Sequence, residues 1–346
     1  MRLLHNPLRG AGLPSTAGMA VGEISLDIEG ARALYARCPV AAPTPLLSLR
    51  TLASDLGIAS LHAKDERQRM GLGSFKALGA AYALAKDADA AGGDPATALS
   101  GRTYVCASAG NHGISLASGA RLFGAAAVVY LSRTVPEGFA ERLRSMGATI
   151  LRVGGDYEET LTAAMEEAEK RGWHLLSDSS WQDYSDPPRD VMEGYLIMGA
   201  EAGEQMAASP THVFLQAGVG GLAAAGAAMA RRCWGDAVRI VVVEPETAPA
   251  LYNSIEAGYP VGVPVIESTM GQLNSKEPSH LALKYLAREA DDFMLVSERE
   301  GEDAAARLTD AGMPTTPSGA GGLAGLCAMA APRIEAFIYV SEDAVN

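Results

Sequence analysis

The sequence predicts an α/β protein with two doubly wound, three-layer domains and a ligand cleft between them. From about residue 58, apolar runs of strand length alternate with longer segments of helical pattern, as in sheets that carry helices on both faces. Two of these runs, at 104–107 and 212–215, are followed by a glycine-rich turn and then a helix, and ligands of such folds bind at strand ends. The length of 346 residues allows one large domain or two ordinary ones.

The first glycine-rich turn places Lys76 at the start of a helix of small residues. Residues 63–84 read AKDERQRMGLGSFKALGAAYAL, in which the lysine follows Gly71 and Gly73. Burial or a nearby cation lowers the pKa of a lysine and makes its amine a nucleophile. Lys76 is therefore a candidate for a Schiff base with a carbonyl group, and the alternative is a solvated lysine at a helix start.

A second turn, SAGNHG at residues 108–113, follows a predicted strand at 104–107 and leads into a predicted helix at 114–122. Unpaired backbone N–H groups and the positive end of the helix dipole converge at such a turn, which predicts a site for a carboxylate or phosphate. The candidate substrate-binding residues in this turn are Ser108, Ala109, Asn111 and His112. The alternative for the His112 ring is a structural histidine.

A third turn, QAGVGGL at residues 216–222, joins a predicted strand at 212–215 to an alanine-rich helix at 223–231. The candidates for a phosphate cradle are Gly218, Val219, Gly220, Gly221 and Leu222. Gly218, Gly220 and Ala223 also match a dinucleotide fingerprint, with Glu244 spaced as its ribose-binding acid. A nicotinamide cofactor would leave Lys76 without a role, so we favour the phosphate of a smaller cofactor and keep nicotinamide as the alternative.

The remaining apolar runs divide into two groups. Strands predicted at 126–130, 149–153 and 174–176 alternate with helices at 137–145 and 156–171, whereas strands at 240–243 and 337–340 belong with the third turn. We expect a smaller domain inserted into a larger one, with the smaller at residues 77–190 and the larger at residues 1–76 and 191–346. Residues 86–101, KDADAAGGDPATALSG, predict an exposed, mobile loop.

The composition predicts a cytoplasmic metabolic enzyme. A net charge of −13 and a pI near 5.0 disfavour nucleic acid and anionic membranes as partners. The four cysteines are far apart in the sequence and no histidine cluster accompanies them, so we expect neither a disulfide framework nor a metal site. No segment has the apolar length of a signal peptide core or a membrane span.

Together, the three turns resemble those of the β-family of pyridoxal-phosphate enzymes, which has the tryptophan synthase β-like fold. The resemblance implies that pyridoxal 5'-phosphate lies in the cleft between the domains, bound to Lys76, with Asn111 at its ring hydroxyl and its phosphate at residues 218–222. Near the end of the chain, PSGAGGL at residues 317–323 resembles the family's turn before its last helix. Ser341 corresponds to the hydroxyl that faces the pyridine nitrogen, and Ser318 is its rival, with a helix N-cap as the alternative for Ser318.

Within this family, the sequence most resembles the diaminopropionate ammonia-lyases. The resemblance is carried by KDERQRMGLGSFKALGAAYA, by SDSSW at residues 177–181 and by TMGQLN at residues 269–274. It implies that Asp178 is an active-site carboxylate that pairs with the β-amino group of the substrate; the alternative is a cap for the segment that contains Trp181. At Ala109 the ammonia-lyases carry an aspartate instead, and here the turn has the form found in serine and threonine dehydratases.

The implied reaction is a β-elimination that converts 2,3-diaminopropionate into pyruvate and ammonia. Lys76 would remove the α-proton after the substrate amine displaces it from the cofactor. A neutral hydroxyl at the pyridine nitrogen favours expulsion of a β-substituent over transamination. The alternatives are a dehydratase for serine, threonine or 3-hydroxyaspartate, a nicotinamide-dependent oxidoreductase, and a catalytically silent pyridoxal-phosphate protein. A homodimer is expected by resemblance.

Overall fold

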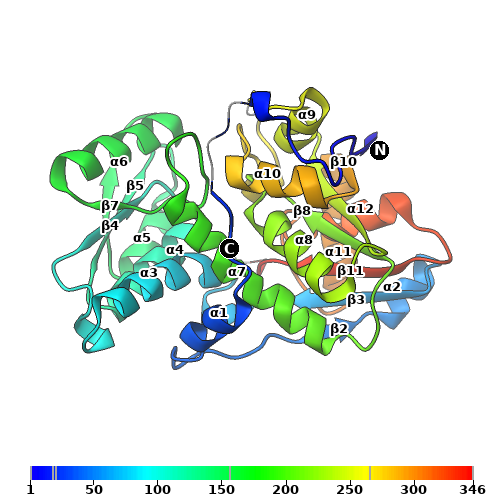
Figure 1. Cartoon of the computed structure of the whole chain (residues 1–346), viewed down its shortest axis with the longest axis horizontal. Coiled ribbons are helices and arrows are strands. Elements are labelled where there is room, and N and C mark those ends of the chain that lie inside the picture. Colours follow the sequence, from blue (N-terminus) through cyan, green and yellow to red (C-terminus); the bar gives the residue numbers. More distant parts are fainter. Residues whose placement is uncertain (1, 18, 20–21, 156, 265, 345–346) are drawn as a thin grey trace.

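The computed structural model describes residues 2–17, 19, 22–155, 157–264 and 266–344. Its strands form one sheet of seven and one of four, and helices cover both faces of each. In Figure 1 the small sheet lies on the left and the large sheet on the right. The predicted α/β class with layered sheets is therefore confirmed.

The large sheet is mainly parallel. Its strand order is β1 (Arg2–His5), β10 (Asp292–Val296), β9 (Arg239–Pro245), β8 (His212–Gln216), β11 (Glu335–Val340), β3 (Ser60–Asp65) and β2 (Leu46–Ser48). Only the edge strands β1 and β2 run antiparallel to their neighbours. The strands predicted within β8, β9 and β11 from apolar runs lie in the interior of this sheet, where both faces are buried.

Successive residues of the central strands pack into two different cores. In β9, Ile240 and Val242 join a core with α7 (Asp186–Gln205), α8 (Gly221–Trp234) and α10 (His280–Glu289). Val241 and Val243 face the other way, because side chains alternate along a strand. Their core includes residues of α2 (Arg50–Asp55), α11 (Glu298–Asp310) and α12 (Gly321–Met329).

The small sheet is entirely parallel, in the order β6 (Ala148–Arg152), β5 (Ala126–Leu131), β4 (Thr103–Cys106) and β7 (His174–Leu175). One face packs on α3 (Ala77–Ala91), α4 (Asn111–Leu122) and α5 (Glu137–Ser145), and the other on α6 (Tyr157–Arg171). All four strands lie within residues 77–190 and those of the large sheet lie outside, which supports the proposed domain division. Asp156, the predicted start of a helix, and residues 1, 345 and 346, at the outer limits of the predicted large domain, lie outside the described residues.

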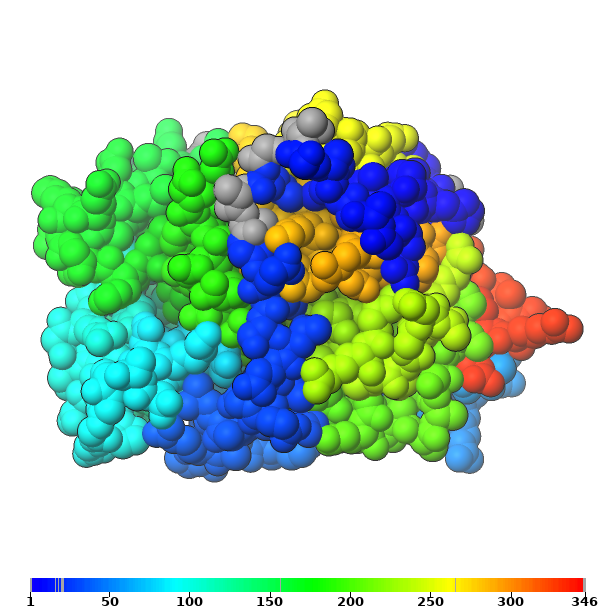
Figure 2. Space-filling view, in the orientation of Figure 1, coloured from blue at the N-terminus to red at the C-terminus, as the bar shows by residue number. Residues whose placement is uncertain are grey.

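The helix α7 lies between the two sheets and packs against both α3 and α8. The blue segment that leads into the first helix runs along this boundary in Figure 2. There, Ile24 N donates to Tyr285 Oη at 3.1 Å and Ser25 N to Glu193 Oε1 at 2.8 Å. The segment continues into α1 (Ile28–Tyr35), which packs on α7.

Short helical elements lie in several of the connecting segments. The 3-10 turns are Ser15–Ala17, Arg69–Gly71, Pro95–Thr97 and Gly271–Leu273, and the remaining helix is α9 (Ala250–Ala257). None of the helices in the described ranges has the length and apolar character needed to cross a membrane.

The prediction of a mobile loop at residues 86–101 is wrong in its first part. Helix α3 continues to Ala91, with Ala88 buried, and Leu99 is fully buried beyond the helix. The alanines of this segment favour helix, and the glycine at position 92 ends it with a φ of +72°. Polar and glycine content alone therefore misled the prediction, because tertiary burial of Ala88 and Leu99 orders the segment.

Candidate active site

A cavity of about 880 Å³ lies at the carboxyl ends of β4, β8 and β11. Its wall includes these residues predicted as site residues: Lys76, Ser108, Ala109, Asp178, Gly218, Val219, Gly220, Gly221, Leu222 and Ser341. Asn111 and His112 are buried behind this wall rather than part of it. A cavity at strand ends and between two layered units is the usual place for a ligand in such folds.

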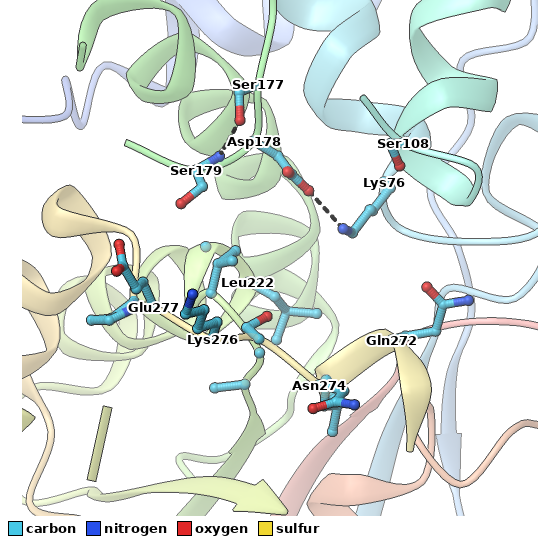
Figure 3. Close-up of a pocket in the computed structure, with 18 of the residues that line it drawn as sticks. Lys76, Ser108, Ser177, Asp178, Ser179, Leu222, Gln272, Asn274, Lys276 and Glu277 are labelled. Carbon is cyan, nitrogen blue, oxygen red and sulfur yellow. Dashed lines mark hydrogen bonds and ion pairs between the residues drawn. The ribbon is translucent and has the colours of Figure 1, made fainter. Parts of the chain in front are cut away.

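Lys76 and Asp178 form an ion pair in this cavity. Lys76 Nζ donates to Asp178 Oδ2 at 2.6 Å, and the two side chains are only 22% and 17% exposed (Figure 3). Lys76 is thus a largely buried amine, not the solvated lysine of the alternative. Burial alone would raise the pKa of Asp178, but the charges of Lys76 and His112 and the hydrogen bond from Lys76 hold that pKa well below its usual range. Asp178 is therefore ionised at neutral pH.

The segment that carries Asp178 is capped by another residue. Ser179 N donates to Ser177 Oγ at 3.1 Å, and Trp181 pairs with Tyr184 through backbone hydrogen bonds. Figure 3 shows the Asp178 carboxylate turned toward Lys76. Ser177 rather than Asp178 therefore caps this segment, and the binding role of Asp178 stays a prediction.

The turn between β8 and α8 forms a cradle that suits a phosphate. Gly220 has a φ of +100°, and a Cβ on Gly218 would lie 2.9 Å from Ser275 Oγ and 3.0 Å from Leu273 Cα. Helix α8 begins at Gly221 without a side-chain cap, so its first N–H groups have no partner within the helix. These N–H groups and the helix dipole fit the phosphate of the cofactor implied by the resemblance.

The asparagine turn begins helix α4. Asn111 is 5% exposed, and its Nδ2 donates to Glu342 Oε2 at 2.8 Å. His112 Nε2 donates to the Leu176 carbonyl oxygen at 2.8 Å, which supports the structural alternative for the His112 ring. Before the helix, Ser108 and Ala109 line the cavity.

Glu342 is a cavity residue that sequence reasoning missed. It follows Ser341, is 3% exposed, and accepts hydrogen bonds from Asn111 Nδ2 and Thr316 Oγ1. Burial raises the pKa of Glu342, against the opposing effects of Thr316, Lys76 and Asn111. The only signal in the sequence was its position directly after Ser341, at the end of an apolar strand.

Ser318 is not a helix cap. Helix α12 begins at Gly321 without a side-chain cap, and Ser318 Oγ instead accepts the N–H of Gln272 at 3.1 Å. Ser318 and Ser341 both line the cavity, as do Gln272, Asn274, Lys276 and Glu277, which Figure 3 shows on the side opposite Asp178. No site role was predicted for these four residues, although Gln272 and Asn274 lie in the TMGQLN stretch. Lys276 pairs with Glu158 of α6.

Glu244, which the nicotinamide alternative requires as its ribose-binding acid, has another function. Glu244 is 1% exposed, lies outside the cavity wall, and accepts the backbone N–H groups of Leu251 and Tyr252 at 2.8 and 2.7 Å. It therefore caps α9. Within the described ranges, no three histidine, cysteine or acidic side chains are grouped as metal ligands.

Comparison with known proteins gives one family. A family model described as pyridoxal-phosphate dependent enzyme matches residues 38–336. The diaminopropionate ammonia-lyase of Escherichia coli K12 is 32% identical over 274 residues, which cover 73% of this chain and 67% of that protein. The enzyme of the same name from Salmonella typhimurium is 36% identical over 243 residues, which cover 64% of this chain and 60% of that protein.

A solved structure extends the likeness to nearly the whole chain. The Escherichia coli diaminopropionate ammonia-lyase in complex with an aminoacrylate-PLP azomethine reaction intermediate superposes with a TM-score of 0.86. It is 26% identical and covers 99% of this chain and 93% of that one.

Proposed function

This chain belongs to the pyridoxal-phosphate dependent enzymes, and we propose that it is an ammonia-lyase that acts on 2,3-diaminopropionate. One diaminopropionate and one water would give one pyruvate and two ammonia molecules: the first ammonia leaves the β-carbon, and the second leaves when the released enamine is hydrolysed. The observation that carries the proposal is the buried Lys76–Asp178 pair, in the same cavity as the glycine cradle. A lysine nucleophile, an anion cradle and an ionised carboxylate are what this reaction requires.

The residues of the cavity fit the cofactor. The N–H groups at residues 218–222 would hold its phosphate, Lys76 its carbonyl carbon and Ser341 its pyridine nitrogen. Asn111, which begins α4 behind the cavity wall, would reach its ring hydroxyl. When bound, pyridoxal phosphate withdraws electrons from the substrate's α-carbon.

Two side chains would act on the substrate, one as a base and the other as a counter-ion. Lys76 Nζ, once displaced by the substrate amine, removes the α-proton. The Asp178 carboxylate, which is in contact with Lys76, pairs with the cationic β-amino group and holds the bond to be broken in place. Ser108 and the backbone of the asparagine turn would bind the substrate carboxylate at the start of α4.

A second candidate function is the dehydration of serine, threonine or 3-hydroxyaspartate. The observation that favours it is Ala109, which lines the cavity at the position where the ammonia-lyases carry an aspartate. The methyl group offers no second carboxylate to a cationic substrate.

The deciding experiment is absorbance spectroscopy followed by a substrate panel in the same cuvette. We expect a visible cofactor band that borohydride removes, and rapid pyruvate release from L-2,3-diaminopropionate. Pyruvate from serine, with none from the diamino acid, would replace the ammonia-lyase by the dehydratase. A visible band without 2-oxo acid from any of the four amino acids would identify a silent binding protein.

The assembly and location of the enzyme are proposed by resemblance. We infer a homodimer in the cytoplasm, in keeping with the acidic net charge of −13, which disfavours anionic partners. Light scattering coupled to size-exclusion chromatography tests the dimer, and a mass of one chain, 35.9 kDa, would contradict it.

A further inference from the structure

Glu342 links three turns that are far apart in the sequence. Its main chain forms a β-bridge with Ser74 in the lysine turn, and its carbonyl oxygen accepts the Thr315 hydroxyl. Its carboxylate reaches Asn111 at the start of α4 and Thr316 in the last glycine turn. A single residue in the cavity wall thus contacts the turns that carry Lys76, Asn111 and Ser318.

The carboxylate determines which way the Asn111 amide points. The two ends of an asparagine amide have nearly the same shape, so its orientation depends on the partners around it. Both oxygens of the Glu342 carboxylate accept hydrogen bonds in the structure, one from Thr316 Oγ1 and the other from Asn111 Nδ2 at 2.8 Å, so the amide nitrogen of Asn111 faces Glu342. The second hydrogen of that nitrogen stays free for another acceptor.

The carboxylate is itself held in one position. Thr316 Oγ1 donates to its other oxygen, and the same Thr316 hydroxyl accepts the N–H of Gly319 at 2.9 Å. A Cβ on Gly319 would lie 2.1 Å from Thr315 Oγ1 and 3.1 Å from Glu342 Cγ, so the backbone is close to both side chains. Glu342 is therefore an anchored acceptor rather than a mobile acidic side chain.

We propose that Glu342 is a positioning residue that fixes the Asn111 amide as a hydrogen-bond donor to the ring oxygen of the cofactor. The proposal rests on the contact between Asn111 and the cofactor stated above, and not on the identity of the substrate. The competing explanation is a direct effect of the Glu342 charge on the nitrogen of Lys76, because the two groups interact electrostatically across the cavity.

Two conservative variants separate contact from charge. Glu342→Asp keeps the charge but withdraws the carboxylate by about 1.5 Å, one carbon–carbon bond, which breaks a 2.8 Å hydrogen bond. Glu342→Gln removes the charge but keeps an oxygen that can accept from Asn111. The measured quantity is the apparent pKa of the visible band of the lysine-bound cofactor.

Opposite shifts are expected for the two explanations. A donor on the ring oxygen draws negative charge away from the nearby nitrogen, so loss of the Asn111 contact raises the pKa of that nitrogen. We expect Glu342→Asp and Asn111→Ala each to raise the apparent pKa by about one unit. We expect Glu342→Gln to stay within about 0.3 units of the wild type, and Glu342→Asp to add nothing in an Asn111→Ala background. Cofactor affinity should fall about tenfold in Glu342→Asp.

Several results would overturn the proposal. A lowered pKa in Glu342→Gln with no change in Glu342→Asp would assign Glu342 a direct charge effect on Lys76. An equal shift from Glu342→Asp with and without Asn111 would show that it acts by another route. No shift in Asn111→Ala would remove the asparagine contact on which the proposal rests, without affecting the substrate assignment. Glu244→Asp is the matched control, because it shortens a buried carboxylate outside the cavity and should leave the visible band unchanged.

Discussion

At the residue scale, the contact between Lys76 Nζ and Asp178 Oδ2 predicts which side chain moves the α-proton. In Lys76→Ala with added cofactor, exchange of the substrate α-proton with solvent should fall by about 10³-fold or more, because the base is gone. The cofactor should remain bound, because the N–H groups of the cradle at α8 are unchanged. Proton NMR in deuterated water measures the exchange of the α-proton, and the visible absorbance of the protein measures the bound cofactor. Lys86→Ala is the control, because Lys86 is also paired with carboxylates, those of Asp190 and Glu193, but lies outside the cavity. Unchanged exchange of the α-proton in Lys76→Ala would exclude Lys76 as the base.

The charge of Asp178 predicts a substrate-dependent effect. The pKa of Asp178 is held well below its usual range, so the carboxylate stays charged at neutral pH and can pair with a β-ammonium group. Asp178→Asn should therefore lower kcat/KM for 2,3-diaminopropionate about 10-fold to 100-fold more than for serine. Ser177→Ala, which removes only the cap of the turn, should affect the two substrates equally. Equal losses of kcat/KM for the two substrates in Asp178→Asn would assign Asp178 a structural role.

The residues that could be predicted are those with a local signal. Lys76 and the glycine cradle each belong to a glycine-rich turn that precedes a helix, so a short stretch of sequence identifies them. No short stretch of sequence identifies Glu342 as a site residue, because its hydrogen-bond partners Asn111 and Thr316 lie 231 and 26 positions away in the sequence. Its place in the wall depends on the joining of the two sheets, which no local pattern encodes.

At the element scale, the interior strands β8, β9 and β11 were predicted because burial on both faces gives them continuous apolar sequences, whereas the interior strands β3 and β10 were missed. The run at residues 240–243 has that pattern, and β9 is an interior strand in the structure. The edge strands β1 and β2 of the large sheet were missed because short, half-exposed segments lack this pattern, whereas the edge strands β6 and β7 of the small sheet were predicted. The prediction for the first part of 86–101 was wrong for a related reason: Ala88 is buried in the core of the small sheet, and composition does not show burial.

The close packing of α3 on α7 predicts that Lys76 is sensitive to a distant glycine. A Cβ on Gly194 of α7 would lie 2.4 Å from the Leu78 carbonyl oxygen of α3, and Lys76 lies directly before α3. Gly194→Ala should cost about 1–3 kcal/mol in the free energy of unfolding and lower kcat, because the helices must separate. Gly138→Ala, in open space on α5, should instead stabilise by up to about 1 kcal/mol. Urea denaturation compares the two, and equal effects would contradict the close packing.

At the scale of the whole molecule, a buried charge cluster ties the lysine turn to the helix between the sheets. Lys64 and Arg69 are fully buried, and both donate to Glu201 Oε2 of α7 at 2.7 Å. Arg69 also pairs with Glu66 at 2.7 Å, so two cations meet two carboxylates. Because α7 packs against α3 and α8, removal of one charge is expected to weaken the connection between the small and large sheets.

This cluster predicts how stability depends on pH. Burial alone would raise the pKa of Glu201, but the hydrogen bonds and charges of Arg69 and Lys64 lower it from its ordinary 4.5. A carboxyl whose pKa is lowered by folding stabilises the folded state fully above its unfolded pKa of 4.5, and this stabilisation is lost as the pH falls through the lowered value. Glu201→Gln should therefore lower the free energy of unfolding by about 3–5 kcal/mol at about pH 7. At about pH 3 the difference from the wild type should shrink, because this pH lies below the unfolded pKa of 4.5 and the unfolded chain is then stabilised by proton uptake at Glu201.

Urea denaturation at the two pH values measures this difference, with Glu204→Gln as the control. Glu204 is on the same helix and pairs with Arg32, but its side chain is 63% exposed. Its variant should change the free energy of unfolding by less than about 1 kcal/mol at neutral pH, because water screens an exposed pair. If Glu201→Gln were no more costly than Glu204→Gln at neutral pH, the cluster would not stabilise the joining of the two sheets. If its cost were the same at both pH values, lost packing rather than lost charge would be the cause.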